Sequence, residues 1–565
     1  MMKRKHALTV VTLVSLIFLV FFIYPTLSVL SEAFRDPDGG FTVSFVAEVF
    51  RDPVYMEGLW NALLLGVVST LATFVIAFPL ALISHRYDFF GRKILGVLIL
   101  IPLVLPPFVG AIGLTRVLSV TGSLNSLLID LGLMEGDARF DWLAHGRFWG
   151  IVVMNALHLY PILYMNIAAA LANLDPAMEQ AAQNLGCPPW RRLWRITLPL
   201  AMPGIFAGGS IVFIWAFTEL GVPLVFNYTR VAPVQVFQGI KDLSGNPAPY
   251  ALVAIMLLVS ATVFGVTKWF FGRSTSGAQP RPKGRGSEEK LPPIKSFAAA
   301  ALFLGVFLVA SVPHAGVLAL ALSEDWYDSI FPAGWTLAHF SEALGDPLVV
   351  PSIENSLLYA SVATLVAAVL GLAIAWVVVR SDIRGRMILD ALVMLPLAVP
   401  GLVLAFGYLA LSQEGKPLHF MVKLADGPAL LLIAAYAVRR LPYVVRAAVA
   451  GLQQSNPAME EAARSLGAGP WRTLRRVSIP LIGANVAAGA ILAFAFAMLE
   501  VSDSLILAEQ AQHYPITKAI YTLLGNLGNG QELAAALGTW AMVFLATAII
   551  GATRLAGKSG GLFKM

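Results

Sequence analysis

The chain has 565 residues, of which 58% are hydrophobic and only 13% are charged. Soluble globular proteins are usually about 45–50% apolar and about a quarter charged, so most of this sequence cannot face water. The net charge of +6 would suit nucleic acid, but the charges lie in short stretches between long apolar runs, which is the pattern of membrane loops and argues against a nucleic-acid partner.

The first predicted span follows a basic N-terminus, Lys3, Arg4 and Lys5, and runs from about Ala7 to Leu30. A signal peptide also begins with basic residues, but its apolar region is about 7–15 residues long and ends at a small-residue cleavage site. This run is long enough to cross about 30 Å of hydrocarbon. We therefore expect it to be retained as a membrane helix.

Apolar runs of about twenty residues, the length that crosses a bilayer, recur twelve times. Irregular backbone cannot face lipid, so each run is predicted to be helical. The fold class is then an all-α polytopic membrane protein with about 12 transmembrane helices. The runs are centred near Phe18, Thr70, Leu105, Tyr160, Ile211, Leu257, Val309, Leu365, Leu402, Val438, Ala493 and Leu545.

The loop charges predict the orientation. With the N-terminus inside, the cytoplasmic segments hold 25 Lys and Arg residues and the external loops hold nine. Because cytoplasmic loops are enriched in Lys and Arg, we expect both termini to be cytoplasmic, in a bacterial plasma (inner) membrane.

The sequence repeats itself on either side of a polar segment, 273–296, which is predicted to be a flexible cytoplasmic linker. Arg86 and Gly91 match Arg380 and Gly385 at an offset of 294, which later becomes 281 because one external loop is longer in the first half. The predicted domains are thus two homologous six-helix halves, 1–272 and 297–565. Repeated halves are common in transporters.

The longest cytoplasmic loop of each half, 175–199 and 456–480, carries the closest match. Asp175 or Asn456 is a good N-cap, and the proline that follows each suits the first helical position. Gly186 or Gly467 is predicted to end that helix, and a second, basic helix follows. A short helix pair of this kind has little core of its own, so we expect it to dock on a partner.

These loops resemble the signature of the permease subunits of binding-protein-dependent ABC importers, and the fused halves are similar to the ferric-iron branch. The resemblance implies a type I importer-like fold and coupling helices that contact the ATPase through Glu179, Gln180, Ala181, Ala182, Gly186, Glu460, Glu461, Ala462, Ala463 and Gly467. Gln180 stands where the signature has glutamate, and we expect Glu179 to compensate.

The resemblance also implies the partners. They are two copies of a separate ABC ATPase, which would use ATP and Mg, and a soluble substrate-binding protein on the external face, with membrane lipid around the chain. The nearest phosphate-binding motif, at 551–559, has the wrong spacing and follows a span rather than a strand. The chain is therefore expected to be a transport subunit, not an enzyme, and to bind no cofactor.

Charged residues inside membrane spans are costly and usually functional. Six such positions are candidates for the translocation path, and the alternative is that they only fix helix packing: His158, Glu219, Arg439, Arg440, Glu500 and Asp503. Pro106 with Pro107, and Pro400 with Gly401, are expected to break the third span of each half.

The substrate is open at this stage. The resemblance suggests ferric iron, with phosphonate, sugar phosphate or thiamine as alternatives, and the arginines suit an anion or iron carried with an anion. The scattered histidines and the lone Cys187 predict no metal site. The rival classes are an ion-gradient-driven secondary transporter, which does not predict the paired loops, and a membrane scaffold, which leaves the polar positions within the spans without a role.

Overall fold

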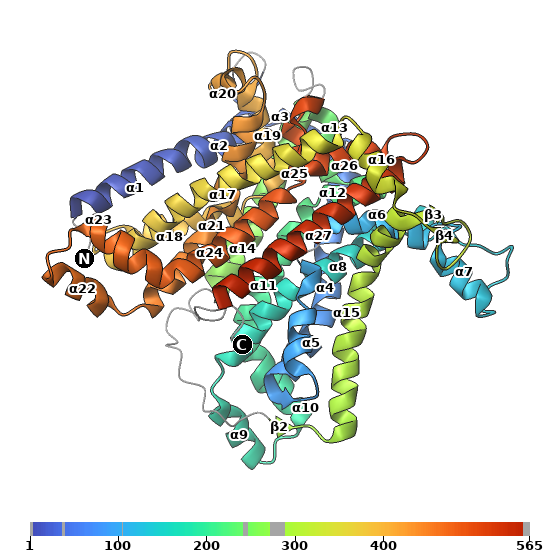
Figure 1. Ribbon diagram of the computed structural model, residues 1–565, viewed down its shortest axis with the longest axis horizontal. Coiled ribbons are helices and arrows are strands. Elements are labelled where there is room, and N and C mark those ends of the chain that lie inside the picture. The colour runs from blue at the N-terminus through green and yellow to red at the C-terminus, as the bar shows by residue number, and fades with distance from the viewer. Residues whose placement is uncertain (1–3, 37–39, 104–105, 241–246, 272–288, 558–565) are drawn as a thin grey trace. The chain divides into compact units, whose positions relative to one another are not determined.

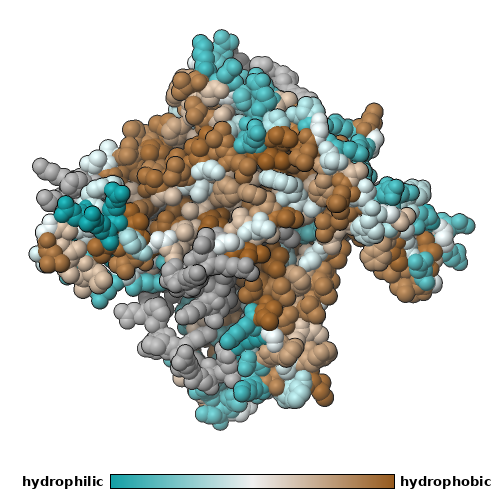
Figure 2. All heavy atoms as spheres, viewed as in Figure 1, coloured by the Kyte–Doolittle hydropathy of each residue, from teal (hydrophilic) through white to brown (hydrophobic). Residues whose placement is uncertain are grey.

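The computed structural model describes residues 4–36, 40–103, 106–240, 247–271 and 289–557, and they form an almost wholly helical chain (Figure 1). Within these residues, ten helices are long and apolar enough to cross a membrane, and a bent pair brings the number to eleven. Large apolar side chains such as Val75 and Val369 are exposed along them, and Figure 2 shows the hydrophobic surface that results. The prediction of an all-α polytopic membrane protein is confirmed.

The bent pair lies where the third span of the second half was predicted to break. Helix α18 (Arg386–Met394) with the turn after it and helix α19 (Gly401–Ser412) meet at 92°. Helix α21 (Ala429–Gln454) accounts for the remaining predicted span. It is long enough to cross, but it carries Arg439, Arg440 and Arg446. In the first half, Leu105 and most of the linker 273–296 lie outside the described residues.

The chain divides into two compact units. One, called unit 2, contains Val49–Gln238 and Ile255–Leu337. Its long helices α4, α8 and α11 pack together, and α15 packs on α6. Its elements are α4 (Pro53–Arg86), β1 (Tyr87–Asp88), α5 (Arg92–Leu98), α6 (Pro107–Leu118), α7 (Ser123–Asp130), α8 (Trp142–Ala172), α9 (Pro176–Asn184), α10 (Pro189–Arg192), α11 (Leu198–Thr218), α12 (Gly221–Val225), α13 (Ala232–Gly239), β2 (Glu289–Lys290), α15 (Pro293–Leu322), β3 (Ser323–Asp325) and β4 (Gly334–Trp335).

Unit 1 contains Met1–Glu48, Gly239–Ala254 and Ala338–Met565. Its helices α17, α21 and α24 pack together, α27 packs on α24, and α2 packs on α19. Besides those given above, its elements are α1 (Arg4–Phe18), α2 (Tyr24–Ala33), α16 (Ala338–Gly345), α17 (Val349–Arg380), α20 (His419–Leu424), α22 (Pro457–Ser465), α23 (Pro470–Thr473), α24 (Ile479–Met498), α25 (Ser502–Leu507), α26 (Ile516–Leu524) and α27 (Gly530–Gly557). Helix α3 (Ser44–Arg51), helix α14 (Ala248–Phe271) and, by its last residue, helix α13 contribute residues to both units.

The units do not follow the order of the chain, because each takes in the opening helix of the other half. A Cβ on Gly113 of α6 would lie 2.1 Å from the Pro313 carbonyl oxygen of α15, and a Cβ on Gly407 of α19 would lie 2.6 Å from the Pro25 carbonyl oxygen of α2. Gly113 and Gly407 are repeat partners at the offset of 294. Small residues let membrane helices approach this closely. The predicted boundaries, 1–272 and 297–565, therefore describe the sequence repeat rather than the compact units.

Candidate functional site

The loops 175–199 and 456–480 each begin with the predicted capped helix. The Asp175 side chain accepts a hydrogen bond from the Ala177 amide at 3.0 Å, and the Asn456 side chain accepts one from the Ala458 amide at 3.0 Å. Such caps satisfy amides that have no partner within the helix. In Figure 1, α22 lies at the left end of its unit and α9 at the lower end of its own.

A left-handed glycine ends both helices, as predicted. Gly186 has φ +74° and Gly467 has φ +81°. The amide after each glycine donates back into the helix, from Cys187 to the Ala182 carbonyl at 2.9 Å and from Ala468 to the Ala463 carbonyl at 3.0 Å. This is the hydrogen-bond pattern of a glycine C-cap. The chain then turns sharply toward the second, basic helix.

In the first loop, Glu179 faces inward. Arg86, at the end of α4, donates to Glu179 at 2.5 Å and to the Thr197 hydroxyl at 2.7 Å, and Thr197 also donates to Glu179. Burial raises the pKa of the Glu179 carboxyl, but the bonds from Thr197 and Arg86 and the Arg86 charge outweigh it, so that this pKa lies below its usual value.

The second loop has the same arrangement at its repeat partners. The Arg380 Nε, at the end of α17, donates to both oxygens of Glu460 at 3.2 Å, and the Ser478 hydroxyl donates to Glu460 at 3.1 Å. Thr197 and Ser478 are each the last residue of a five-residue π-helical turn, a feature that often marks functional sites.

The other predicted coupling residues face outward. Gln180, Ala181 and Gly186 are exposed in the first loop, as are Glu461, Ala462 and Gly467 in the second, whereas Ala182 and Ala463 are half-buried. Glu179 therefore does not substitute for the glutamate that Gln180 replaces. It is the partner of Glu460, and the position of Gln180 corresponds to the exposed Glu461.

Apolar side chains are exposed beside them at matching positions in the two loops. Leu185 and Leu466 are 88% and 89% exposed, and Trp190 and Trp471 are 69% and 72% exposed. Large apolar groups clustered on a surface indicate an interaction site. Each loop thus presents an apolar face whose underside is fixed by an ion pair.

Four of the six candidate path residues lie together in unit 1. Arg439 contacts Glu500 at 2.5 Å and Asp503 at 3.0 Å, and Arg440 forms an ion pair with Glu500. Both acids are buried. The formal charges of the four residues sum to zero, which fits the packing alternative because paired charges avoid most of the penalty of burial.

The other two candidates lie in unit 2. Glu219 accepts hydrogen bonds from the Gly221 amide at 3.0 Å and the Trp215 indole at 3.2 Å. His158 bonds the Pro102 carbonyl at 3.0 Å, and its ring lies 5.8 Å from the Trp215 ring. Because the Gly221 amide is at the start of α12, the Glu219 carboxylate caps that helix.

Several residues of these sites were missed from the sequence. The sequence repeat pairs Arg86 with Arg380 at an offset of 294, and the same repeat pairs Thr197 with Ser478 at an offset of 281. It does not predict that these residues contact a glutamate of the two loops. A Cβ on Gly401 would lie 2.2 Å from the Arg439 guanidinium, which no local pattern reveals.

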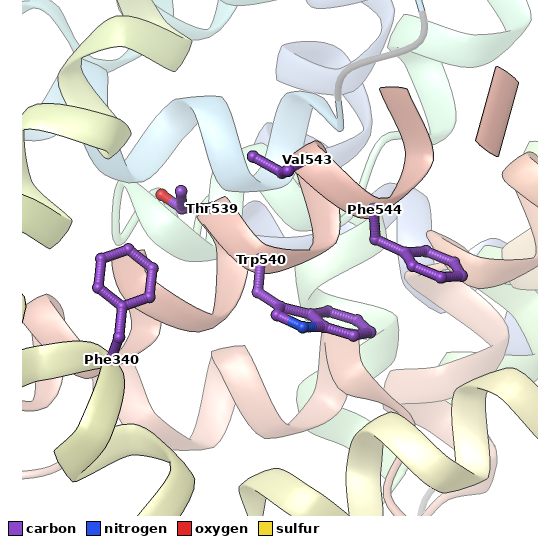
Figure 3. A pocket seen from close by; sticks show the side chains of 5 residues that line it. All are labelled: Phe340, Thr539, Trp540, Val543 and Phe544. Atoms are coloured by element: carbon purple, nitrogen blue, oxygen red, sulfur yellow. The ribbon is translucent and has the colours of Figure 1, made fainter. Parts of the chain in front are cut away.

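Metal-ligand clusters and surface grooves are two further kinds of possible binding site. Within the described residues, no group of three or more His, Cys, Asp or Glu side chains could hold a metal ion. A shallow groove between α16 and α27 is lined by Phe340, Thr539, Trp540, Val543 and Phe544 (Figure 3). None of the candidate residues lines this groove, and no side chain in its lining is charged.

Known proteins resemble this chain over most of its length. A putative ferric transport system permease protein, FbpB 1, of Haemophilus influenzae is 28% identical over 86% of this chain and 75% of that protein. A ferric transport system permease protein, FbpB, of Actinobacillus pleuropneumoniae is 28% identical over 85% of this chain and 68% of that protein. The molybdenum transport system permease protein ModB of Haemophilus influenzae is 28% identical over 38% of this chain and 91% of that protein.

Among solved structures, a bacterial ABC transporter that imports the acidic polysaccharide alginate is matched over 47% of this chain and 96% of that one, with a TM-score of 0.35 and 15% identity. The model of one protein family matches the chain twice, over residues 74–274 and 367–554. Because these two matches cover more than half of the sequence and repeat once in each half, the chain belongs to the family of binding-protein-dependent transport system inner membrane components.

Proposed function

We propose that this chain forms the transmembrane pathway of an ATP-driven importer of ferric iron, and that its loops 175–199 and 456–480 are the two contacts with the ATPase. The observation that carries the proposal is the match between the loops. Each presents an exposed Leu directly before the same glycine cap and an exposed Trp after it, at an offset of 281. Two equivalent surfaces fit two copies of one partner.

The proposed partners follow from the family. The ATPase would be a separate polypeptide in two copies and would hydrolyse ATP with Mg, while this chain only transmits the movement. A soluble binding protein would deliver the substrate on the external face. The excess of Lys and Arg in one set of loops, 25 against nine, supports a multi-pass topology in the bacterial inner membrane with both termini cytoplasmic.

The substrate proposal rests on the relatives and on the charges of unit 1. Two relatives matched over 86% and 85% of this chain are described as ferric transport permeases, whereas ModB, described for molybdenum, matches over a smaller part. The two arginines that favoured an anion are neutralised by Glu500 and Asp503. They therefore give no support to phosphonate or sugar phosphate as substrate.

The six intramembrane candidates are proposed to border the path rather than to bind the solute within it. Each of them has a polar atom that bonds another of the six or neighbouring backbone, as at Arg439–Glu500 and at Glu219–Gly221. In that arrangement they would stiffen the walls through which the ion passes. Family membership leaves the ion-driven and scaffold alternatives without support.

The decisive experiment joins the loops to the ATPase. A cysteine at Leu185 or Leu466, in a chain whose Cys187 is changed to serine, should cross-link to the co-expressed ATPase. Gly467→Leu should detach the ATPase and abolish iron uptake while leaving membrane insertion intact, because the side chain is strained at φ +81° and intrudes on the contact surface.

Gly483→Leu in α24 is the matched control, since a Cβ there meets open space and the glycine has no left-handed φ. It should transport like the original chain. Absence of any cross-link at both leucines, or normal uptake with Gly467→Leu, would refute the coupling role. Uptake of molybdate rather than ferric iron into proteoliposomes would overturn the substrate alone.

A further inference from the structure

Glu460 is the sole buried residue of α22, every residue of which is described. A helix on a protein surface usually attaches through an apolar stripe, but here the attachment is a carboxylate. In the ion pair, the Glu460 side chain is 4% exposed and the Arg380 side chain is 10% exposed. Besides the chain connections at its two ends, α22 is therefore attached to the rest of unit 1 by this one buried side chain.

Glu460 connects three separate elements. Arg380 comes from the end of α17, and its guanidinium also donates to the Leu452 carbonyl at 2.9 Å and the Ser455 hydroxyl at 2.8 Å, at the end of α21. Ser478 comes from the π-helical turn that leads into α24. The helices α17, α21 and α24 are also the ones that pack together in this unit.

The first loop connects two of the corresponding elements of unit 2, α4 and α11. Glu179 joins α9 to the end of α4 through Arg86 and to the start of α11 through Thr197. Immediately after Arg86, β1 pairs with β2, which precedes α15, and the Leu291 amide donates to the Asp88 carbonyl at 3.2 Å. The two arrangements thus share the arginine and hydroxyl contacts of the glutamate, whereas the contact of Arg380 with the end of α21 is found in the second loop.

We infer that these two sets of three residues, Arg86–Glu179–Thr197 and Arg380–Glu460–Ser478, here called the clamps, are positioning residues that convert movement of the docked ATPase into movement of the membrane helices. This inference rests on the proposed function. The clamps lie beneath the docking face, so a broken clamp leaves a contact surface that still binds the ATPase but no longer pulls on the helices behind it.

The physical reason is the burial of the pair. An ion pair at the surface contributes little, but a partly buried pair resists separation, because each charge loses its partner where water cannot fully replace it. Hydrogen bonds from a charged donor to a carboxylate are also about twice as strong as those between neutral groups. The clamp thus behaves as a stiff joint between α22 and the three long helices.

The test is the ratio of iron transported to ATP hydrolysed, in proteoliposomes that contain the ATPase and the iron-loaded binding protein. Glu460→Gln and Arg380→Met should each lower this ratio at least tenfold while ATP hydrolysis continues. The exchange of the two residues, Arg380→Glu with Glu460→Arg, should restore at least a third of the ratio. A purely structural loss would lower transport and hydrolysis together and would not be rescued.

The matched control is Asp382→Asn, which removes an acidic side chain near Arg380. The Asp382 carboxylate is exposed, and its ion pair with Arg386 is long, at 3.8 Å. Its transport ratio should stay within twofold of the original. If Glu460→Gln does not insert, Ser478→Ala and Glu179→Gln test milder losses in the two clamps, with an expected reduction of at least threefold.

A normal ratio in Glu460→Gln, or in both milder variants, would overturn the clamps. The cross-link from Leu466 to the ATPase separates this failure from failure of the proposed function. If the cross-link forms and the ratio is unchanged, the clamp inference is wrong and the docking proposal stands. If Leu466→Cys forms no cross-link in a chain whose clamps are intact, the docking proposal is wrong as well.

Discussion

Glu219 and Glu500 occupy equivalent positions in the two halves, yet they are held in different ways. Glu500 lies between two arginines and beside Asp503. Glu219 receives backbone and indole hydrogen bonds, and its region holds His158, Leu159 and Val222 where the second half has Arg439, Arg440 and Asp503.

The two acids are similar in one respect, since both follow the end of a long apolar helix, Glu219 directly after α11 and Glu500 two residues after α24. The difference shows that the repeat preserves the position of an acid at a helix break while its partners have diverged. A carboxylate capping backbone amides and one embedded in an ion network satisfy the same need, which is to avoid an unpaired charge in the membrane.

The largest expected effect comes from breaking the ion network. Arg439→Met leaves two buried carboxylates with one arginine, so we expect a loss of about 3–5 kcal/mol in the free energy of unfolding, measured in detergent micelles. Adding Asp503→Asn restores the charge balance and should recover about half of that loss. If Arg439→Met costs less than about 1 kcal/mol, the network contributes no more than a surface pair.

An intermediate effect is expected at Gly401, whose Cβ position lies against the Arg439 guanidinium. Gly401→Ala should displace Arg439 from its two carboxylates and cost about 1–3 kcal/mol of unfolding free energy. In the Arg439→Met background the guanidinium group is absent, so Gly401→Ala should then leave the unfolding free energy nearly unchanged. Equal costs in the two backgrounds would contradict this contact.

A smaller effect is expected at Glu219. Glu219→Gln keeps an oxygen that accepts the same bonds from Gly221 and Val222, so the unfolding free energy should fall by only about 0.5–1 kcal/mol. The matched change, Glu500→Gln, removes the charge that two arginines share and should cost several times more. Similar losses at the two positions would mean that their surroundings are equivalent after all.

The smallest expected effect is a pH dependence in the first loop. Because the pKa of Glu179 is lowered from its ordinary value of 4.5, the ionised carboxylate stabilises the folded state above that pH. This contribution is lost as the pH falls through the lowered value. The difference in melting temperature between the original chain and Glu179→Gln should therefore shrink below about pH 4.5; a constant difference would show that the charge plays no part.

Much of the fold follows from local sequence. Long apolar runs predict the membrane-spanning helices, and Asp175 or Asn456 before a proline predicts the capped start of α9 or α22. Gly186 and Gly467 gave the left-handed ends, and Pro400 with Gly401 marked the bend between α18 and α19. In each case the decisive interactions join residues only a few positions apart, so the pattern along the chain contains them.

The candidate sites could be predicted only in part, because their contacts join distant residues. Glu179 and Gln180 are neighbours on one short helix, and the residue that turns inward depends on Arg86, 93 positions away. Arg439 and Glu500 were both expected in spans, but their ion pair joins residues 61 positions apart and no local pattern predicts it. His314 is buried in α15, and because it lies alone in an apolar run, no motif marks it in the sequence.

The exchange of opening helices bears on the order in which the protein is made. Helix α2 must find α19, nearly four hundred residues later, and the Tyr408 hydroxyl that bonds the Phe21 carbonyl at 2.5 Å does not exist while the ribosome is still synthesising the first half. Unit 2, by contrast, is complete in sequence once Leu337 has emerged. The earliest helix in the nascent chain is therefore among the last to reach its final place, and a chain cut short after the first half would leave α2 without the surface on which it packs.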